Sequence, residues 1–240
     1  MTAPEMVDQP FRGLPKIRSR GPLAEKVYAI LKESIIQGKF ASGMWLQEEA
    51  LTKALGVSRT PLREAFNRLK SEGFIEVLPR KGAHIIELSD DELADLFEVR
   101  EQIETVFFVR SATAVPQATI DRLRSSMQQS EQAMRHSVNK PEQWNEERIR
   151  YLRNDRLLHD TLIKASGNKC WERLYFDIRD RIEIFGNQLS FDQEWFDVAI
   201  EDHYAIIDAI LAGDYETGCR AMRQHIANVH RGIVRIRASR

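Results

Sequence analysis

The feature that most constrains this chain is a tight turn, Gly56-Val57, between two short segments whose apolar residues recur at helical spacing. Before the turn, a helix over residues 47–55 is predicted by the apolar residues Ala50, Leu51, Ala54 and Leu55. After it, a helix over residues 58–71 is predicted by Leu62, Ala65, Phe66 and Leu69. Ser58 is suited to cap this second helix, and Pro61 is tolerated in its first turn. Two short helices joined in this way predict a helix-turn-helix.

The flanking segments extend this unit in both directions. A helix is expected from Leu23 to about Gly38, and two β-like runs at 74–78 and 83–86 flank the basic turn Pro79-Arg80-Lys81-Gly82. Beyond residue 89 the pattern is almost entirely helical, with helices expected at 90–114, 117–136, 142–166, 168–187, 195–212 and 214–236. The fold class is therefore mainly α: a flexible arm (1–20), a winged helix-turn-helix (21–88) and a C-terminal all-α helical bundle (89–240).

Composition narrows the classes of protein further. No stretch approaches the ~18 continuous apolar residues that a membrane span requires, and residues 1–20 lack the apolar region of a secretory signal. Two cysteines without metal-ligand spacing favour a reduced, cytoplasmic protein. Residues 1–86 carry 14 Lys and Arg against 9 Asp and Glu, whereas the remainder is acidic. This asymmetry is typical of a chain in which only the first part meets a polyanion.

The predicted helix at 58–71 has a polar, cationic first half opposite its apolar stripe. Ser58, Arg59, Thr60 and Arg63 occupy that half. Arginine pairs bidentately with guanine, while hydroxyl groups and a helix N-terminus suit phosphates. Gly82 at the wing lets the backbone approach a phosphate or the minor groove. The alternative is that these arginines lie on an ordinary solvated helix face.

At these residues the chain resembles the GntR family of bacterial regulators. The resemblance is carried by Leu55-Gly56-Val57-Ser58-Arg59-Thr60-Pro61-Leu62-Arg63-Glu64-Ala65, then Arg68-Leu69 and Glu72-Gly73, with Gln37-Gly38-Lys39-Phe40 and Arg80-Lys81-Gly82-Ala83 on either side. It implies that Arg59, Thr60 and Arg63 read DNA and that Gly82 lies on the wing. One departure is Glu48-Glu49, where some relatives carry a basic contact, and this puts phosphate contacts from that helix in doubt.

In the C-terminal half, four polar residues fall on apolar helix faces: Asp155 and His159 on one predicted helix, His203 on the next but one, and His225 on the last. A single inward histidine is usually a satisfied core residue. Three histidines and an aspartate on three helices are harder to explain in that way, because buried polar groups are costly unless they are paired. A shared divalent cation would satisfy them, and this donor set suits zinc first, with nickel or manganese as alternatives.

This half resembles the FCD ligand-binding domain of the FadR-like branch of GntR regulators, and its six predicted helices resemble the VanR-like variant. Asp155-x-x-x-His159, the segment around His203 and Ala221-Met222-Arg223-Gln224-His225 are similar to its metal-bearing segments. The resemblance implies that the metal helps to hold a small carboxylate effector and that Arg100 binds it, since an arginine can grip a carboxylate bidentately. The alternative for Arg100 is a surface ion pair with Glu101 or Glu104.

Together these patterns predict a regulator, and not an enzyme, with no catalytic residues. We expect a homodimer that binds a palindromic double-stranded DNA operator, acts as a repressor, and changes its operator affinity when the effector binds. In a second interpretation the metal is structural or is itself the signal. A metal-dependent hydrolase is the remote alternative, because open metal positions can activate water. A ligand titration distinguishes them, since turnover indicates the enzyme.

Overall fold

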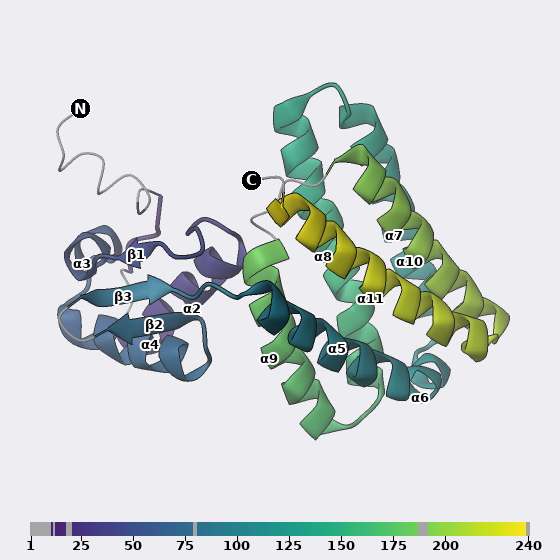
Figure 1. The fold of residues 1–240 in the computed structure, drawn as a ribbon, viewed down its shortest axis with the longest axis horizontal. Helices are drawn as coiled ribbons and strands as arrows, with labels where there is room; N and C mark the ends of the chain where they lie inside the picture. The colour runs from purple at the N-terminus through teal and green to yellow at the C-terminus, as the bar shows by residue number, and fades with distance from the viewer. Residues whose placement is uncertain (1–10, 12, 18–20, 79–80, 187–191, 239–240) are drawn as a thin grey trace. The chain divides into compact units, whose positions relative to one another are not determined.

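The computed structural model describes residues 11, 13–17, 21–78, 81–186 and 192–238. The chain packs as two compact units (Figure 1), the first comprising residues 1–89 and 179–189 and the second residues 90–178 and 190–240. The sequence placed all of 89–240 in one helical domain. The structure instead groups the last turns of one helix of that segment with the N-terminal unit.

Among its described residues, the first unit contains three complete helices and a small sheet (Figure 1): α2 (Leu23–Ile36), β1 (Trp45–Leu46), α3 (Glu48–Leu55), α4 (Arg59–Ser71), β2 (Ile75–Leu78) and β3 (Gly82–Ile85). The strands are antiparallel in the order β1-β3-β2. Strands β2 and β3 form the predicted hairpin, in which Ile75 pairs with Ile85 and Leu78 with Gly82. The two-residue strand β1 is not predicted by the sequence, because it is too short to show alternation and is fixed by pairing with β3.

Helices α3 and α4 meet at the predicted turn. Gly56 ends α3 with a φ of +70°, a left-handed conformation that glycine adopts without strain. The apolar stripe of α4 is buried against α2 and α3, and its members are Leu62, Ala65, Phe66 and Leu69. Because that face is fixed in the core, the polar half of α4 is turned outward.

Other segments complete this core. Most of the predicted flexible arm, residues 1–20, lies outside the described residues. Of its described part, however, Phe11 is buried, and the backbone N–H of Ile17 donates to the carbonyl of Leu55 at 2.9 Å. Ile184 and Phe185 are also buried in this core. The first unit is thus assembled from segments distant in the sequence.

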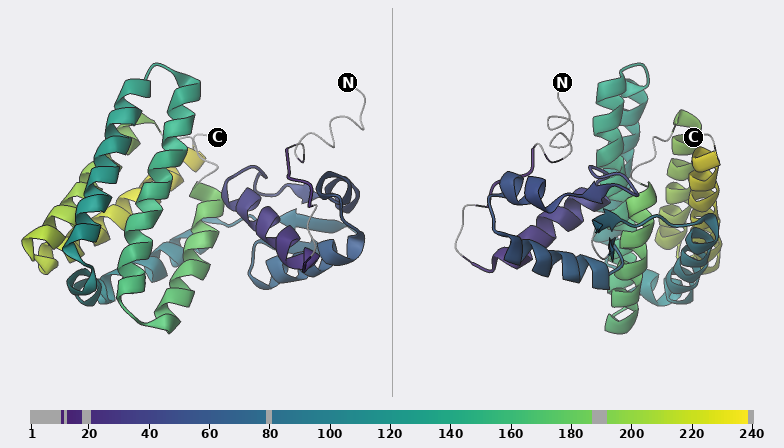
Figure 2. Two further views of the ribbon diagram at one scale, coloured as in Figure 1. Left: turned by 180° about the vertical axis from the view of Figure 1, so that it is seen from behind. Right: turned by 60° about the vertical axis from the view of Figure 1, so that its left-hand side comes forward.

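The second unit is a helical bundle made of α5 (Asp90–Val106), α6 (Phe108–Ala114), α7 (Gln117–Ser137), α8 (Pro141–Ala165), α10 (Gln193–Ala212), α11 (Tyr215–Ala238) and the first part of α9 (Lys169–Gly186). Helices α7 and α8 form a hairpin (Figure 2), and α10 packs against both α7 and α11. Helix α11 also packs against α5 and α6. Within the described ranges, every helix is too short or too polar to span a bilayer.

One predicted helix is wrong: residues 90–114 form two helices, α5 and α6. The break falls at Phe107, whose backbone (φ −99°, ψ 4°) leaves the helical region and whose ring packs on Trp171 at 5.2 Å between centroids. No glycine or proline marks this position, so the break is a product of tertiary packing. The described part of 90–240 therefore contains seven helices where six were expected, and helix number does not support the comparison with the VanR-like variant.

Candidate metal centre and nucleic-acid interface

The bundle of the second unit brings four predicted polar residues together. Asp155 and His159 lie one turn apart on α8, His203 comes from α10 and His225 from α11. One ligand atom from each residue lies within 4.8 Å of all the others. The three histidine side chains are buried, whereas 26% of the Asp155 side chain is exposed. The cluster is thus an internal site with solvent access beside Asp155.

The three imidazoles all present Nε2 to the same carboxylate oxygen. Oδ1 of Asp155 lies 2.8 Å from Nε2 of His203, 3.7 Å from that of His225 and 3.8 Å from that of His159. Although the His203 distance is short, its geometry is not that of a hydrogen bond, and this buried Nε2 has no hydrogen-bond partner among the described residues. Converging lone-pair donors with an unsatisfied member fit a divalent cation better than a hydrogen-bonded core.

The opposite edge of each ring faces a second polar group. Nδ1 of His159 contacts Oε2 of Glu104. Nδ1 of His203 lies 3.1 Å from the hydroxyl of Tyr151, and Nδ1 of His225 lies 3.6 Å from Oδ2 of Asp202. The partners of His159 and His203 are within hydrogen-bond range and hold these rings with Nε2 directed inward, as in protein metal sites, whereas Nδ1 of His225 has no hydrogen-bond partner among the described residues.

The electrostatics of the cluster favour an ionised Asp155 and a neutral His225, the states that bind metal. Burial raises the pKa of Asp155, but the close approach of His203 and the charges that the histidines can carry lower it well below its usual range. Burial also raises the pKa of Glu104, but His159 and Arg100 together lower it to about 2. For His225, burial and the neighbouring His203 lower the pKa. Ionised carboxylates and neutral imidazoles are the forms that coordinate metals.

Arg100 lies beside this cluster and not on the surface. It is buried, and its Nε donates to Oε1 of Glu104 at 2.6 Å, so Glu104 links Arg100 to His159. Burial lowers the pKa of Arg100, but the negative charge of Glu104 acts against this effect, and the pKa is raised above its usual range. The ion pair with Glu104, which the sequence left as the alternative for Arg100, therefore forms, but inside the bundle and not on the surface. Glu101 instead pairs with Arg223 at 2.9 Å.

The candidate DNA-reading residues lie on the outer face of α4 and on the wing. Arg59, Thr60 and Arg63 are exposed, and Ser58 precedes the helix in an extended conformation without a side-chain capping bond. Gly82 is exposed, and its φ of +104° is one that side-chain-bearing residues rarely adopt. Arg80, also expected on the wing, lies outside the described residues. The candidate DNA-binding surface thus consists of the outer face of α4, which can enter a groove, and Gly82 of the hairpin.

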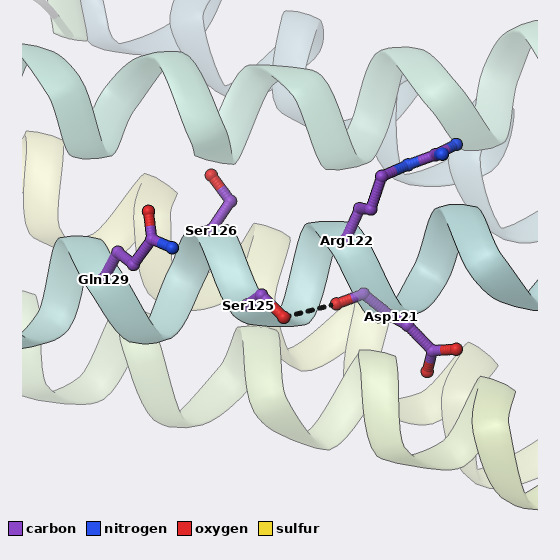
Figure 3. A pocket seen from close by; sticks show the side chains of 5 residues that line it. All are labelled: Asp121, Arg122, Ser125, Ser126 and Gln129. Atoms are coloured by element: carbon purple, nitrogen blue, oxygen red, sulfur yellow. Dashed lines mark hydrogen bonds between the residues drawn. The ribbon is translucent and has the colours of Figure 1, made fainter.

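A separate hollow lies along one face of α7 (Figure 3) and is lined by Asp121, Arg122, Ser125, Ser126 and Gln129. The hydroxyl of Ser125 donates to the backbone carbonyl of Asp121 at 2.9 Å. Sites for small organic ligands are mostly apolar and enclosed, whereas this hollow is open and lined by polar and charged residues. None of the DNA-binding, metal-binding or effector-binding residues predicted from the sequence lines this hollow.

Comparison with protein families accounts for both units. Residues 23–85 match the model of bacterial regulatory proteins of the gntR family, and residues 95–228, more than half of the chain, match the FCD domain. The chain belongs to the GntR family. As a GntR regulator with an FCD domain it is a DNA-binding transcriptional regulator and not an enzyme.

Two curated GntR relatives illustrate the similarity. The chain is 26% identical over 216 residues to the gluconate operon transcriptional repressor of Bacillus licheniformis, covering 88% of this chain and 85% of the relative. It is 25% identical over 221 residues to the transcriptional repressor RspR of Escherichia coli, covering 90% of this chain and 91% of the relative. The similarity in both cases extends over the two units.

Solved structures of GntR proteins share the fold. Escherichia coli McbR/YncC matches with a TM-score of 0.70 at 20% identity, over 88% of this chain and 99% of that one. The crystal structure of a GntR-type regulator from Rhodococcus sp. RHA1 matches with a TM-score of 0.68 at 19% identity, over 88% and 97% of the two chains. At this level of identity the similarity concerns the fold alone.

Sequence reasoning missed the groups that surround the histidines of this GntR protein. Glu104 was considered only as a surface partner of Arg100, and Tyr151 and Asp202 were not singled out. A signal existed for Tyr151, which lies four residues before Asp155 and therefore on the same face of α8. For Asp202 there was no comparable signal, since it simply adjoins His203.

Proposed function

We propose that the chain is a ligand-responsive repressor whose second unit senses a small carboxylate at a metal centre. The observation that carries the proposal is the convergence of Asp155, His159, His203 and His225, with Arg100 attached to it through Glu104. In the cytoplasm, effector binding changes the affinity of a homodimer for a palindromic double-stranded DNA operator. Relatives named as repressors support the direction of regulation.

For the DNA contacts, we infer that α4 enters the major groove with Arg59, Thr60 and Arg63. Ser58 and the start of α4 face a phosphate, and Gly82 brings the wing backbone to the adjacent groove or phosphate. Exposure of all five residues supports this assignment. One such surface buries little DNA, so two copies on related half-sites supply the affinity and specificity of a regulator.

For the metal, we infer zinc first, with nickel or manganese as alternatives. Asp155, His159, His203 and His225 would hold it, and a bound cation attracts the carboxylate of an effector and leaves positions for its oxygens. The orientation of each imidazole and the unsatisfied Nε2 of His203 support the donor set. A structural metal, or a metal that is itself the signal, is the competing role for the same residues.

For the effector, we infer a small organic acid. Arg100 is held in the bundle by Glu104, and a guanidinium has five N–H donors, of which Glu104 engages the one on Nε. The remaining donors suit a second carboxylate. Gluconate, after which the operon of one relative is named, belongs to this chemical class.

The decisive experiment is a thermal-shift screen of small carboxylates on the full-length protein, with and without a chelator. A stabilising acid whose effect requires metal, and which also changes retention of a DNA operator selected by the protein, supports the proposal. Stabilisation by metal alone, with DNA binding unaffected by any acid, indicates a structural metal. Metal-dependent DNA binding without an acid makes the metal the signal, and turnover of an acid would indicate the hydrolase.

A further inference from the structure

Glu48 and Arg63 form an ion pair that joins the two helices of the helix-turn-helix. Glu48 is the first residue of α3 and Arg63 lies on the outer face of α4. The Nε of Arg63 lies 3.1 and 3.2 Å from the two oxygens of Glu48, and Nη2 lies 3.1 Å from Oε2. The sequence had marked Glu48-Glu49 only as an acidic pair at a place where some relatives carry a basic contact.

The Glu48 carboxylate pairs with one edge of the Arg63 guanidinium, the edge formed by Nε and Nη2. Nε–H and one N–H of Nη2 face Glu48, while both N–H groups of Nη1 and the second of Nη2 are not used by this pair. Reading of guanine through O6 and N7 requires two N–H groups at the end of the fork, and these remain. The Arg63 side chain is 63% exposed although it is paired, so the unused end is accessible to DNA.

The next residue provides a natural comparison. Glu49 carries the same charge on the same turn of α3 and is exposed, but among the described residues it has no ion pair with Arg63. Both carboxylates add negative charge near a DNA-binding surface. Only Glu48 also fixes the orientation of an arginine. The charge and the positioning of Glu48 can therefore be separated by experiment.

We propose that Glu48 is a positioning residue that raises the DNA sequence specificity of Arg63. Because Glu48 already holds the guanidinium, less conformational entropy is lost when Arg63 binds a base. Because Glu48 also occupies the Nε–Nη2 edge, Arg63 pairs less readily with phosphates at arbitrary sites. The affinity for the specific operator therefore rises, and the affinity for non-specific DNA falls. The proposal rests on the inferred DNA-reading role of Arg63.

The test compares Glu48→Gln, Glu48→Asp and Glu49→Gln in the full-length protein. Operators are selected from a random double-stranded DNA library with the unsubstituted protein, and affinities are then measured for the selected duplex and for unselected duplex. We expect Glu48→Gln to lower the ratio of the two affinities about three- to tenfold relative to Glu49→Gln. Glu48→Asp, which keeps the charge but shortens the side chain, should lower the ratio as well.

A second readout distinguishes positioning from charge. If release of Arg63 allows it to reach a phosphate, the salt dependence of non-specific binding steepens by up to ~0.9 in log–log slope for Glu48→Gln and not for Glu49→Gln. Equal affinity ratios for Glu48→Gln and Glu49→Gln, or an unchanged ratio for Glu48→Asp, overturn the proposal. Arg63→Ala tests the DNA-reading role of Arg63 separately from the positioning role of Glu48. If this variant leaves operator binding unchanged, the assignment of Arg63 itself is wrong.

Discussion

The outer face of α4 and the cluster in the second unit are both built from charged and polar side chains, yet they are formed differently. Ser58, Arg59, Thr60 and Arg63 lie within six consecutive positions, and the apolar stripe of a single helix turns them outward. Asp155, His159, His203 and His225 come from three helices and meet only when those helices pack.

The difference shows how solvation limits or favours ligand binding at each site. The exposed residues are solvated in the free protein, so their pairing with DNA must compete with water and salt. The buried histidines have already lost their water, so an unsatisfied nitrogen there strongly favours a cation. Removal of the buried ligand residues should therefore have larger effects than variants of the exposed face.

The largest effect is expected for His159→Ala combined with His203→Ala. Two of four donors are removed, so the metal content should fall from about one ion per chain to almost none. The lost stabilisation amounts to about 4 kcal/mol where free metal exceeds the dissociation constant by about a thousandfold. Elemental analysis and thermal unfolding measure both quantities. His136→Ala, an exposed histidine on α7, is the control and should change neither. Retention of stoichiometric metal by the double variant would show that other residues bind it.

A smaller effect is expected for Arg63→Ala. Loss of a base-reading arginine should weaken binding to a selected operator by about 1–3 kcal/mol while the fold and the metal content stay unchanged. Titration of a labelled duplex measures the affinity. Lys70→Ala, a charge removed from the exposed far end of the same helix, is the control and should have less effect on specificity. Equal losses in the two variants would argue against groove entry by the first half of α4.

Acidification should also affect the two regions differently. Because the pKa of His225 is lowered in the folded protein, its contribution to stability is complete above the ordinary histidine value of ~6.5 and is lost as the pH falls below it. Each unit of lowering corresponds to about 1.4 kcal/mol. In the first unit, burial raises the pKa of Glu72, but hydrogen bonds from Tyr28 and Lys32 lower it below its usual range, so its contribution is lost only at more acidic pH.

Chemical unfolding of metal-free protein at pH ~7.5 and ~5.5 tests this difference. We expect lower stability at the acidic value, and a smaller pH effect in His225→Asn. An identical pH effect in this variant would assign the titration to other groups.

The smallest effect is expected for Tyr151→Phe, which removes the hydroxyl beside Nδ1 of His203. Loss of a group that orients a metal-binding histidine typically weakens metal affinity by about tenfold or more. The matched control is Tyr204→Phe. The hydroxyl of Tyr204 donates to Glu131 at 2.6 Å and does not contact the four residues of the cluster. Both variants should lose about 1 kcal/mol of stability, but only Tyr151→Phe should bind metal more weakly in a competition assay. Equal metal affinities would mean that Tyr151 does not orient His203.

The sequence by itself determined most of the elements and the outward face of α4. The stripe of Leu62, Ala65, Phe66 and Leu69 predicts the buried side, and the left-handed Gly56 and Gly213 end α3 and α10. It also placed Asp155, His159, His203 and His225 on inner faces. These features depend on residues three or four positions apart, whose spacing is written directly in the chain.

Only the tertiary structure decided which inner faces meet. It broke the helix at Phe107, paired β1 with β3, buried Phe11, and placed Glu104 and Tyr151 behind the histidines. The periodicity of a helix shows which face is covered but not which partner covers it, because contacts between distant segments leave no local pattern. For the same reason the acidic Glu48 acquired a role as the partner of Arg63 only once α3 and α4 were packed together.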